Sequence, residues 1–456
     1  MDGMLFLVPS CLLRSTSQEI STMAAMTDSI GFDPRMCETF TAPTNIAVIK
    51  YWGKANVKLN TPMNSSASLT LDQSDLHTIT TVAAAREYAA QGDRMWLNGE
   101  EITINGRGQA CLREVRKLAQ DRVDPATGEV LVKKVDWGLY AVRASSVNTF
   151  PTGAGLASSA AGLACFVAAL AQLYCAQEEY PGQLTAIARQ GSGSASRSLY
   201  GGLVRWNKGE RADATDSIAV QIADENYWPE IRAVILVVSD KEKDTSSTSG
   251  METSRLTSLL LAHRAKEIVH VRLAEIEAAY LAKDFETFGR ITMQDSNQFH
   301  AVCLDTYPPI FYLNDTSRII IRLVHALNSV LGGIRAAYTF DAGPNAVIYT
   351  TEEHSDLVAC AMARYFPAPA ATEHYCNRPA ELNAIIARAD SLLSPAVIAA
   401  LDATGRVPCA GDVKYVFLTK SGPGPVQQQA SESLLSAETG MPVEPGPRHQ
   451  RMRITH

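Results

Sequence analysis

Residues 151–174 read PTGAGLASSAAGLACFVAALAQLY, a glycine-rich turn that leads directly into a run of small and apolar residues. Gly153 and Gly155 permit tight turns and a close approach of a ligand to the backbone. The first turn of the helix that follows offers unpaired N–H groups and the positive end of its dipole to an anion. The segment therefore predicts a phosphate-binding loop followed by a buried helix over residues 157–174.

Two serines, Ser158 and Ser159, open this predicted helix. Their hydroxyls can donate to a phosphate oxygen or bind the Mg²⁺ that accompanies a nucleotide. The segment lacks the Gly-Lys-Ser/Thr end of a Walker A loop, and Ser158 stands where a dinucleotide fingerprint has its third glycine. A helix start of small residues that simply packs on a sheet is the alternative that the segment leaves open.

The composition indicates a globular protein of two or three domains. The chain has 456 residues, of which 46% are hydrophobic and 20% are charged, and no apolar run is long enough for a membrane span. A net charge of -7 argues against nucleic-acid binding, so the positive charge for an anionic substrate has to be gathered locally. The nine cysteines form no C-x-x-C pair, which is typical of reduced thiols in a cytosolic protein.

The order of strand and helix patterns predicts an α+β protein. An Asn-Gly pair at residues 98–99 predicts a hairpin with a type I′ turn, and the apolar run of residues 230–239 predicts a buried strand. The alternation of strands and helices after it is typical of a split βαβ domain. We expect domains at 37–229 and 230–422, flanked by a disordered extension at 1–36, for which a weak targeting peptide is an alternative, and a disordered tail at 423–456.

A lysine-aromatic segment ends the first apolar strand. Lys50 and Lys54 flank Tyr51 and Trp52. Lysine is rarely buried without a partner, so Lys50 is expected to face an anion or a carboxylate. A solvated strand end, with the aromatic rings covering the edge of a core, is an equally good interpretation.

Two further segments carry groups suited to a site. Arg197 closes Ser192-Gly193-Ser194-Ala195-Ser196, and its guanidinium fork suits a carboxylate or a phosphate. The alternative is a plain helix-to-strand connection, with Arg197 paired to a surface acid. Asp341 follows the strand AAYTF and precedes a rigid Gly-Pro turn that fixes its backbone, although aspartate also opens turns that have no catalytic meaning.

In chain order, TNIAVIKYWGK, PTGAGLASSAAG, GSGSASRSLYGG and DAGPNAV resemble the GHMP kinase superfamily and, within it, the mevalonate diphosphate decarboxylase family. The similarity runs from Thr41 to Gly440, and residues 294–317 resemble that family more than the superfamily. Ala157 stands where the kinases usually have glycine and the decarboxylases have alanine. The resemblance implies a two-domain α+β GHMP kinase fold, with an N-terminal ATP and substrate domain that carries the left-handed-type phosphate loop region, and a ferredoxin-like C-terminal domain.

The same resemblance implies an activity and its setting. Such enzymes use ATP and Mg²⁺ to convert (R)-5-diphosphomevalonate into isopentenyl diphosphate, ADP, phosphate and CO₂, in the mevalonate pathway of isoprenoid and sterol biosynthesis. A cytoplasmic homodimer that binds neither nucleic acid nor membrane is implied as well. A mevalonate-type 3-kinase without decarboxylation and a non-catalytic ligand sensor of the GHMP type are the alternatives.

Site residues are implied at the positions that match the family motifs. Asp341 would orient or deprotonate the C3 hydroxyl, Lys50 would neutralise charge beside it, and Arg197 would hold the substrate carboxylate. Ser159 would contact the γ-phosphate and the metal. The remaining substrate-binding residues would be Tyr51, Trp52, Gly53, Lys54, Arg107, Ser192, Gly193, Ser194, Ala195, Ser196 and, in a flexible loop at 241–251 that closes the site, Thr248. The ATP phosphates would bind Gly153, Gly155, Ser158 and Ser159.

Overall fold

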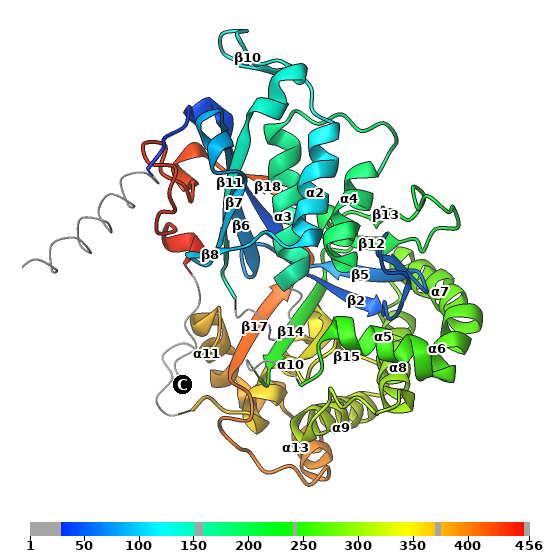
Figure 1. The fold of residues 1–456 in the computed structure, drawn as a ribbon. Helices are drawn as coiled ribbons and strands as arrows, with labels where there is room; N and C mark the ends of the chain where they lie inside the picture. Colours follow the sequence, from blue (N-terminus) through cyan, green and yellow to red (C-terminus); the bar gives the residue numbers. More distant parts are fainter. Residues whose placement is uncertain (1–28, 151–157, 240–243, 370–374, 451–456) are drawn as a thin grey trace, which may run out of the picture.

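The computed structural model describes residues 29–150, 158–239, 244–369 and 375–450. The N-terminal half is built on two sheets (Figure 1). The first has the order β18-β1-β6-β11-β7-β8, with β18 (Val426–Gln427), β1 (Cys37–Pro43), β6 (His77–Ala85), β11 (Ala141–Asn148), β7 (Arg94–Leu97) and β8 (Glu100–Ile102). The second has the order β13-β12-β5-β2, with β13 (Ala219–Ala223), β12 (Leu203–Trp206), β5 (Ser66–Thr70) and β2 (Asn45–Ile49).

Short elements connect these strands. The predicted hairpin between β7 and β8 is confirmed, since Asn98 and Gly99 both have positive φ, 52° and 87°, as a type I′ turn requires. Two small ribbons pair β3 (Lys54–Asn56) with β4 (Thr61–Pro62) and β9 (Arg122–Val123) with β10 (Val130–Val132). The 3₁₀ turns of this half are η1 (Pro34–Met36), η2 (Glu87–Ala90), η3 (Lys134–Leu139) and η4 (Gly193–Leu199).

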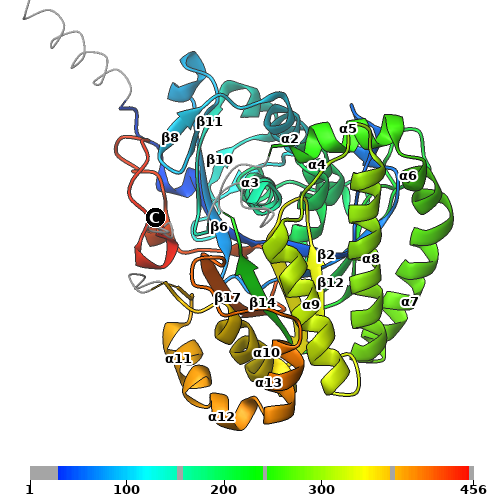
Figure 2. The ribbon, with the colours of Figure 1, turned by 90° about the horizontal axis from the view of Figure 1, so that it is seen from below.

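The helix predicted at 157–174 is α3 (Ser158–Leu173), and it lies at the centre of the N-terminal half. One side of it packs on β1 and β6, and the others meet α2 (Gly106–Lys117) and α4 (Gln183–Gly191). Figure 2 shows α3 end-on between its neighbours. Between its first and last turns α3 has almost no solvent face, which explains why its sequence is small and apolar nearly all round.

The C-terminal half has one antiparallel sheet of order β15-β16-β14-β17, from β15 (Ala336–Phe340), β16 (Ala346–Thr351), β14 (Ile231–Val237) and β17 (Tyr415–Lys420). Because β16 is antiparallel to both β14 and β15, these two strands run parallel with β16 between them. This is the split βαβ arrangement, and the predicted ferredoxin-like order is confirmed.

Two groups of helices connect the strands of this sheet. Between β14 and β15 lie α5 (Ser247–Thr257), α6 (Leu259–His263), the π-helix η5 (Arg264–Ile268), α7 (Val269–Leu281), α8 (Phe285–Asp305) and α9 (Asp315–Val330). Between β16 and β17 lie α10 (Glu352–Tyr365), α11 (Pro379–Ala387), α12 (Ala389–Leu392) and α13 (Pro395–Asp402). The long helices α7 and α8 lie side by side (Figure 2).

One hydrophobic core joins the two halves. Ile46 and Val48 of β2 and Leu69 of β5 belong to the same buried cluster as Val234 of β14 and Phe288 of α8. Within the described residues, no helix has the length and apolarity needed to span a membrane. The predicted domain boundary at 229/230 falls just before β14, and the shared core holds the residues that both halves contribute to the site in a fixed relation.

The segments expected to be disordered differ from that prediction where the structure describes them. Residues 423–450 return to the first sheet, where β18 pairs with β1 and is followed by η6 (Ala430–Glu432) and η7 (Pro447–His449). Leu434 packs on Ile79 and Val147, and Leu435 packs on Ala83, on the face of the sheet opposite to α3. The prediction was wrong because burial of this second apolar face outweighs the Gly/Pro-rich composition. Residues 29–36 pack in the same region, whereas residues 1–28 lie outside the described residues.

Candidate active site

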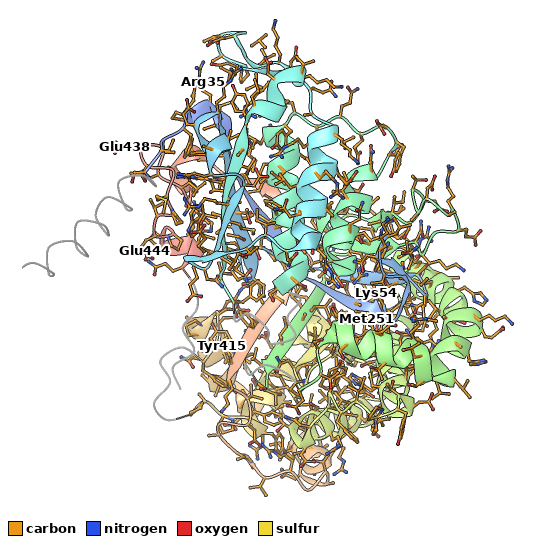
Figure 3. All side chains as sticks on the ribbon, in the orientation of Figure 1. Arg35, Lys54, Met251, Tyr415, Glu438 and Glu444 are labelled. Carbon is orange, nitrogen blue, oxygen red and sulfur yellow. The ribbon has the colours of Figure 1, made fainter. Side chains whose placement is uncertain are left out.

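A cavity of about 350 Å³ lies where the two halves of the chain meet. Its walls come from the end of β2, the first turns of α3 and α5, the turn η4, and the loop that follows β15. Figure 3 shows Lys54 and Met251, one from each half, near this junction. The predicted site residues that line the cavity are Lys50, Tyr51, Trp52, Lys54, Arg107, Ser158, Ser159, Ser192, Gly193, Ser194, Arg197, Thr248 and Asp341.

Some predicted residues do not line it. Ala195 and Ser196 belong to the turn η4 but are fully buried, and the Ser196 hydroxyl donates to the Gly193 carbonyl at 2.8 Å. Gly53 has a φ of +81°, and a Cβ there would lie 2.7 Å from the Met63 sulfur, so this glycine shapes the chain behind the cavity. Gly153 and Gly155 lie outside the described residues.

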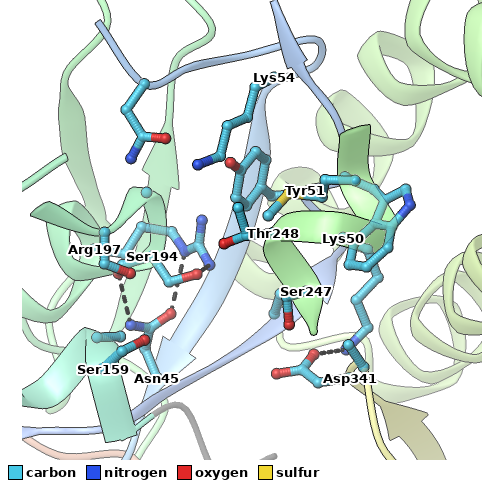
Figure 4. A pocket seen from close by; sticks show the side chains of 18 of the residues that line it. Asn45, Lys50, Tyr51, Lys54, Ser159, Ser194, Arg197, Ser247, Thr248 and Asp341 are labelled. Carbon is cyan, nitrogen blue, oxygen red and sulfur yellow. Dashed lines mark hydrogen bonds and ion pairs between the residues drawn. The ribbon is translucent and has the colours of Figure 1, made fainter. Parts of the chain in front are cut away.

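Lys50 and Asp341 form the most buried ion pair of the cavity wall. The Lys50 Nζ lies 2.6 Å from Asp341 Oδ1, and their side chains are 3% and 30% exposed (Figure 4). Burial lowers the pKa of Lys50, whereas the adjacent carboxylate acts in the opposite direction. Asp341 is therefore the anionic partner of Lys50, and the alternative of a solvated strand end is wrong because Lys50 is buried. The Asp341 carboxylate remains partly exposed to the cavity.

The loop that carries Asp341 is held on both sides. Asn345 accepts hydrogen bonds from the N–H groups of Val238 and Ser239 at 2.7 and 2.9 Å, which ties the loop to the end of β14. Ser317, near the start of α9, donates to the Pro344 carbonyl at 2.8 Å. These contacts fix the direction of the Asp341 side chain, as a group that acts on a reacting atom requires.

Arg197 is a buried cation without a carboxylate partner. It is 2% exposed and, among the described residues, forms no ion pair. Instead its Nε donates to Asn45 Oδ1 at 3.2 Å and Ser68 Oγ at 2.9 Å, and its Nη1 donates to Ser66 Oγ at 2.6 Å. Burial lowers the pKa of Arg197 to about 10. The alternative of pairing to a surface acid is wrong, and the neutral cradle leaves the charge of Arg197 available to a ligand.

A second basic group lies at the other end of the cavity. Burial and the nearby Arg107 lower the pKa of Lys54 to about 8, and neither residue forms an ion pair within the described part of the chain. Beside them the Tyr51 hydroxyl and Asn60 Oδ1 are buried and lack hydrogen-bond partners there. The unsatisfied Tyr51 hydroxyl can donate a hydrogen bond and lies beside two unpaired cations, which indicates a polyanionic ligand at this end.

Two helices point their N-termini at the cavity. Ser158 and Ser159 are the first residues of α3, and Ser247 and Thr248 are the first residues of α5, whose N-cap Ser246 accepts from the Ser249 N–H. Thr248 therefore lies in a helical turn and not in the flexible loop that the sequence predicted, because Ser246 caps the helix. Both helix starts favour an anion.

Several residues that line the cavity were not predicted from the sequence: Asn45, Ala47, Asn60, Ser247, Met251 and Phe299. Asn45 was detectable in principle, since an amide that opens a buried strand needs partners. It orients Arg197 and also donates to the Ser194 carbonyl and Ser198 Oγ at 3.0 and 2.7 Å. Met251 and Phe299 come from helices whose meeting with β2 no local pattern predicts.

Comparisons with known proteins agree with this geometry. Residues 42–219 match the diphosphomevalonate decarboxylase-like N-terminal domain, and residues 233–428 match the mevalonate 5-diphosphate decarboxylase C-terminal domain. The diphosphomevalonate decarboxylase of Rattus norvegicus is 48% identical over 405 residues, which cover 89% of this chain and 96% of that protein.

Solved structures give the same result. An X-ray structure of mevalonate 5-diphosphate decarboxylase matches with a TM-score of 0.75 and 43% identity, over 89% of this chain and 99% of that one. The structure of MDDEF in complex with MVAPP, AMPPCP and magnesium matches with a TM-score of 0.64 and 28% identity, over 86% and 99%. The fold, the cavity and both halves of the sequence therefore agree: the chain belongs to the diphosphomevalonate decarboxylase family.

Proposed function

We propose that the cavity at the junction of the two halves is where this decarboxylase converts ATP and (R)-5-diphosphomevalonate into isopentenyl diphosphate, ADP, phosphate and CO₂. The observation that carries the proposal is the arrangement of charge. The Lys50–Asp341 pair and the unpaired cation Arg197 line one cavity, with the basic group of Lys54 and Arg107 at its other end. A substrate with a hydroxyl, a carboxylate and a diphosphate would offer the hydroxyl to the Lys50–Asp341 pair, the carboxylate to Arg197, and the diphosphate to Lys54 and Arg107.

Asp341 acts on the C3 hydroxyl of the substrate. Its carboxylate accepts the hydroxyl proton or orients the hydroxyl, so that the oxygen attacks the terminal phosphorus of ATP. Lys50, 2.6 Å from Asp341 Oδ1, stabilises the negative charge that gathers between the carboxylate and the transferred phosphoryl group. Phosphorylation is needed because a tertiary hydroxyl is a poor leaving group.

Arg197 holds the carboxylate of the substrate during the second step. The C3–O bond breaks as phosphate leaves, and positive charge develops at C3. The bond from C2 to the carboxyl carbon then breaks, its electron pair forms the double bond, and CO₂ departs. A guanidinium fixed by Asn45, Ser66 and Ser68 aligns that bond without taking part in the electron flow.

The remaining cavity groups suit the phosphates. We assign the 5-diphosphate to Lys54, Arg107 and Tyr51, and the ATP phosphates to the start of α3 at Ser158 and Ser159. Thr248, at the start of α5, faces the same space and helps to exclude water.

The donor groups also fit Mg²⁺. Among the described residues, no cluster of three or more His, Cys, Asp or Glu side chains could hold a metal ion alone. The Ser158 and Ser159 hydroxyls suit an ion that keeps several waters and binds mainly through phosphate oxygens. When bound together with ATP, Mg²⁺ would neutralise part of the negative charge of the phosphates.

A single assay tests the proposal. The purified chain is supplied with Mg-ATP and 5-diphosphomevalonate labelled in the carboxyl group, and labelled CO₂ and ADP are followed together, with Asp341→Ala as the inactive control. Equal release of both supports the proposal. ADP without CO₂ would identify a 3-kinase, and neither product from the folded chain would identify a ligand sensor.

Two expectations about the setting of the enzyme stay predictions. The eight cysteines among the described residues are free thiols, which supports a reducing compartment such as the cytoplasm. The homodimer is testable by sedimentation velocity, in which a monomer would contradict it.

A further inference from the structure

Asp295 lies at the centre of a buried group of charges behind the cavity. It belongs to α8, is 0% exposed, and does not line the cavity. Arg264, also 0% exposed, donates from both terminal nitrogens to the two oxygens of Asp295 at 2.7 Å each. Arg272 adds a third bond to Oδ1 at 3.0 Å. Burial opposes ionisation of Asp295, but Arg264 and Arg272 hold the pKa of its carboxyl below its ordinary value.

This group holds the backbone of Lys50. Lys50 is the first residue after β2, so its peptide groups do not take part in the sheet ladder. Its N–H donates to Asp295 Oδ2 at 2.7 Å, and its carbonyl accepts from Arg264 Nη2 at 3.1 Å and from Asn64 at 3.0 Å. Side chains from α8 and from the π-helix η5 thus replace the missing strand partner. Such π-turns are frequent at functional sites.

The contacts form a direct chain to the reacting groups. Asp295 and Arg264 come from the C-terminal half, Lys50 comes from the N-terminal half, and the Lys50 ammonium reaches back to Asp341 of the C-terminal half. The side chain of Lys50 can only place its ammonium as accurately as its own Cα is placed. An error of about 1 Å at a reacting group costs about 100-fold in rate.

We propose that Asp295, together with Arg264, is a positioning residue of the decarboxylase: the pair fixes the peptide of Lys50 so that its ammonium stays on Asp341 through the phosphoryl transfer. The inference rests on the function proposed above for Lys50. It concerns residues that do not touch the substrates, so it predicts an effect on kcat and not on binding.

The test compares two substitutions at the same carboxylate. Asp295→Asn keeps the shape but removes the charge and one acceptor, and we expect kcat to fall 10- to 100-fold with both KM values within about threefold of the parent. The matched control is Arg272→Gln, because Arg272 donates to Asp295 and Gln298 but not to Lys50. We expect the control to keep kcat within threefold while its melting temperature falls.

Asp295→Asn leaves the buried Arg264 and the partly buried Arg272 poorly paired and can fail to fold, so a second variant is included. Arg264→Met combined with Asp295→Leu removes both charges at once, which buried ion pairs often tolerate. If the double variant folds and its kcat is reduced tenfold or more, the proposal is supported. If it folds and its kcat stays within threefold of the parent, the proposal is overturned. A third comparison uses Lys50→Met, in which Asp295→Asn should cause no further loss of kcat; an additive loss would also overturn it.

The experiment distinguishes a failure of the positioning role from a failure of the proposed function. If the parent chain releases no CO₂, the function itself is wrong. If the parent is active and Asp295→Asn is equally active, only the positioning role is wrong.

Discussion

Replacing Arg197 with glutamine should remove most of the activity while leaving the stability of the fold nearly unchanged. Arg197 is 2% exposed and has no carboxylate partner within the described residues. Burial lowers its pKa from 12.5 to about 10, and because one pKa unit corresponds to about 1.4 kcal/mol, the charge costs the ligand-free fold about 3 kcal/mol. Glutamine removes that cost.

The substitution also removes hydrogen bonds. Glutamine can replace only some of the donors that Arg197 directs to Asn45, Ser66 and Ser68, and the loss of about two or three bonds costs about 2–3 kcal/mol. The two effects nearly cancel, so the free energy of unfolding should change by about 1 kcal/mol or less. The substrate carboxylate, however, loses a charge-assisted contact of about 3 kcal/mol, which lowers kcat/KM by roughly 100-fold or more.

Two measurements check this balance. Steady-state ADP release gives kcat/KM, and thermal unfolding followed by circular dichroism gives the stability of the same preparation. Arg205→Gln is the matched control, since Arg205 lies on the neighbouring strand β12 but pairs with Glu277 at 3.0 Å outside the cavity. If Arg197→Gln keeps kcat/KM within threefold of the parent, Arg197 does not hold the substrate carboxylate. If the variant is inactive because it unfolds at the assay temperature, the predicted balance of stability is wrong.

Three further predictions concern other parts of the chain. Asp341→Ala should lower kcat on the order of 10³-fold with KM nearly kept, because the carboxylate acts in the transition state; near-normal kcat in steady-state kinetics would remove its catalytic role. Gly193→Ala places a Cβ 2.6 Å from the Trp206 ring and 3.0 Å from Tyr51, and should raise KM for diphosphomevalonate about tenfold by displacing the tyrosine; an unchanged KM would show that the rings yield freely. Burial lowers the pKa of His77 from 6.5 to about 4, so the unfolded chain binds more protons between these values. The contribution of neutral His77 to the free energy of unfolding is fully present above pH 6.5 and is lost as the pH falls toward 4. At pH 5 the loss is about 2 kcal/mol. Urea unfolding of His77→Gln across this range should show a flatter profile, and an identical slope would contradict the assignment.

Local sequence patterns predicted the parts of the fold that local chemistry determines. The Asn-Gly turn at 98–99 and the buried helix α3 were predicted correctly because a few adjacent residues determine the backbone conformation of the turn and the apolarity of the helix. The cavity residues Lys50, Arg197 and Asp341 were found because charged side chains in apolar or glycine-rich surroundings need partners. That they share one cavity followed from the family resemblance and not from any single segment.

The missed residues act across long separations in the sequence. Asp295 and Arg264 lie in ordinary helical sequence, and only the packing of α8 and η5 against the end of β2 gives them Lys50 as a partner. Thr248 was misplaced because a serine-rich segment is typical of both loops and helix starts, and the side-chain bond of Ser246 selects the helix. The tail was misjudged because composition does not reveal that β6 has two apolar faces to cover.

The return of the C-terminal residues to the first sheet has a consequence for synthesis on the ribosome. Until residues 426–435 have left the exit tunnel, β1 lacks its outer partner, and Ile79, Ala83 and Val147 remain in water. The N-terminal half therefore completes its folding only after the whole C-terminal half has been made. An expressed fragment that ends near residue 229 would carry an open strand edge and an uncovered apolar face, and we expect such a fragment to aggregate.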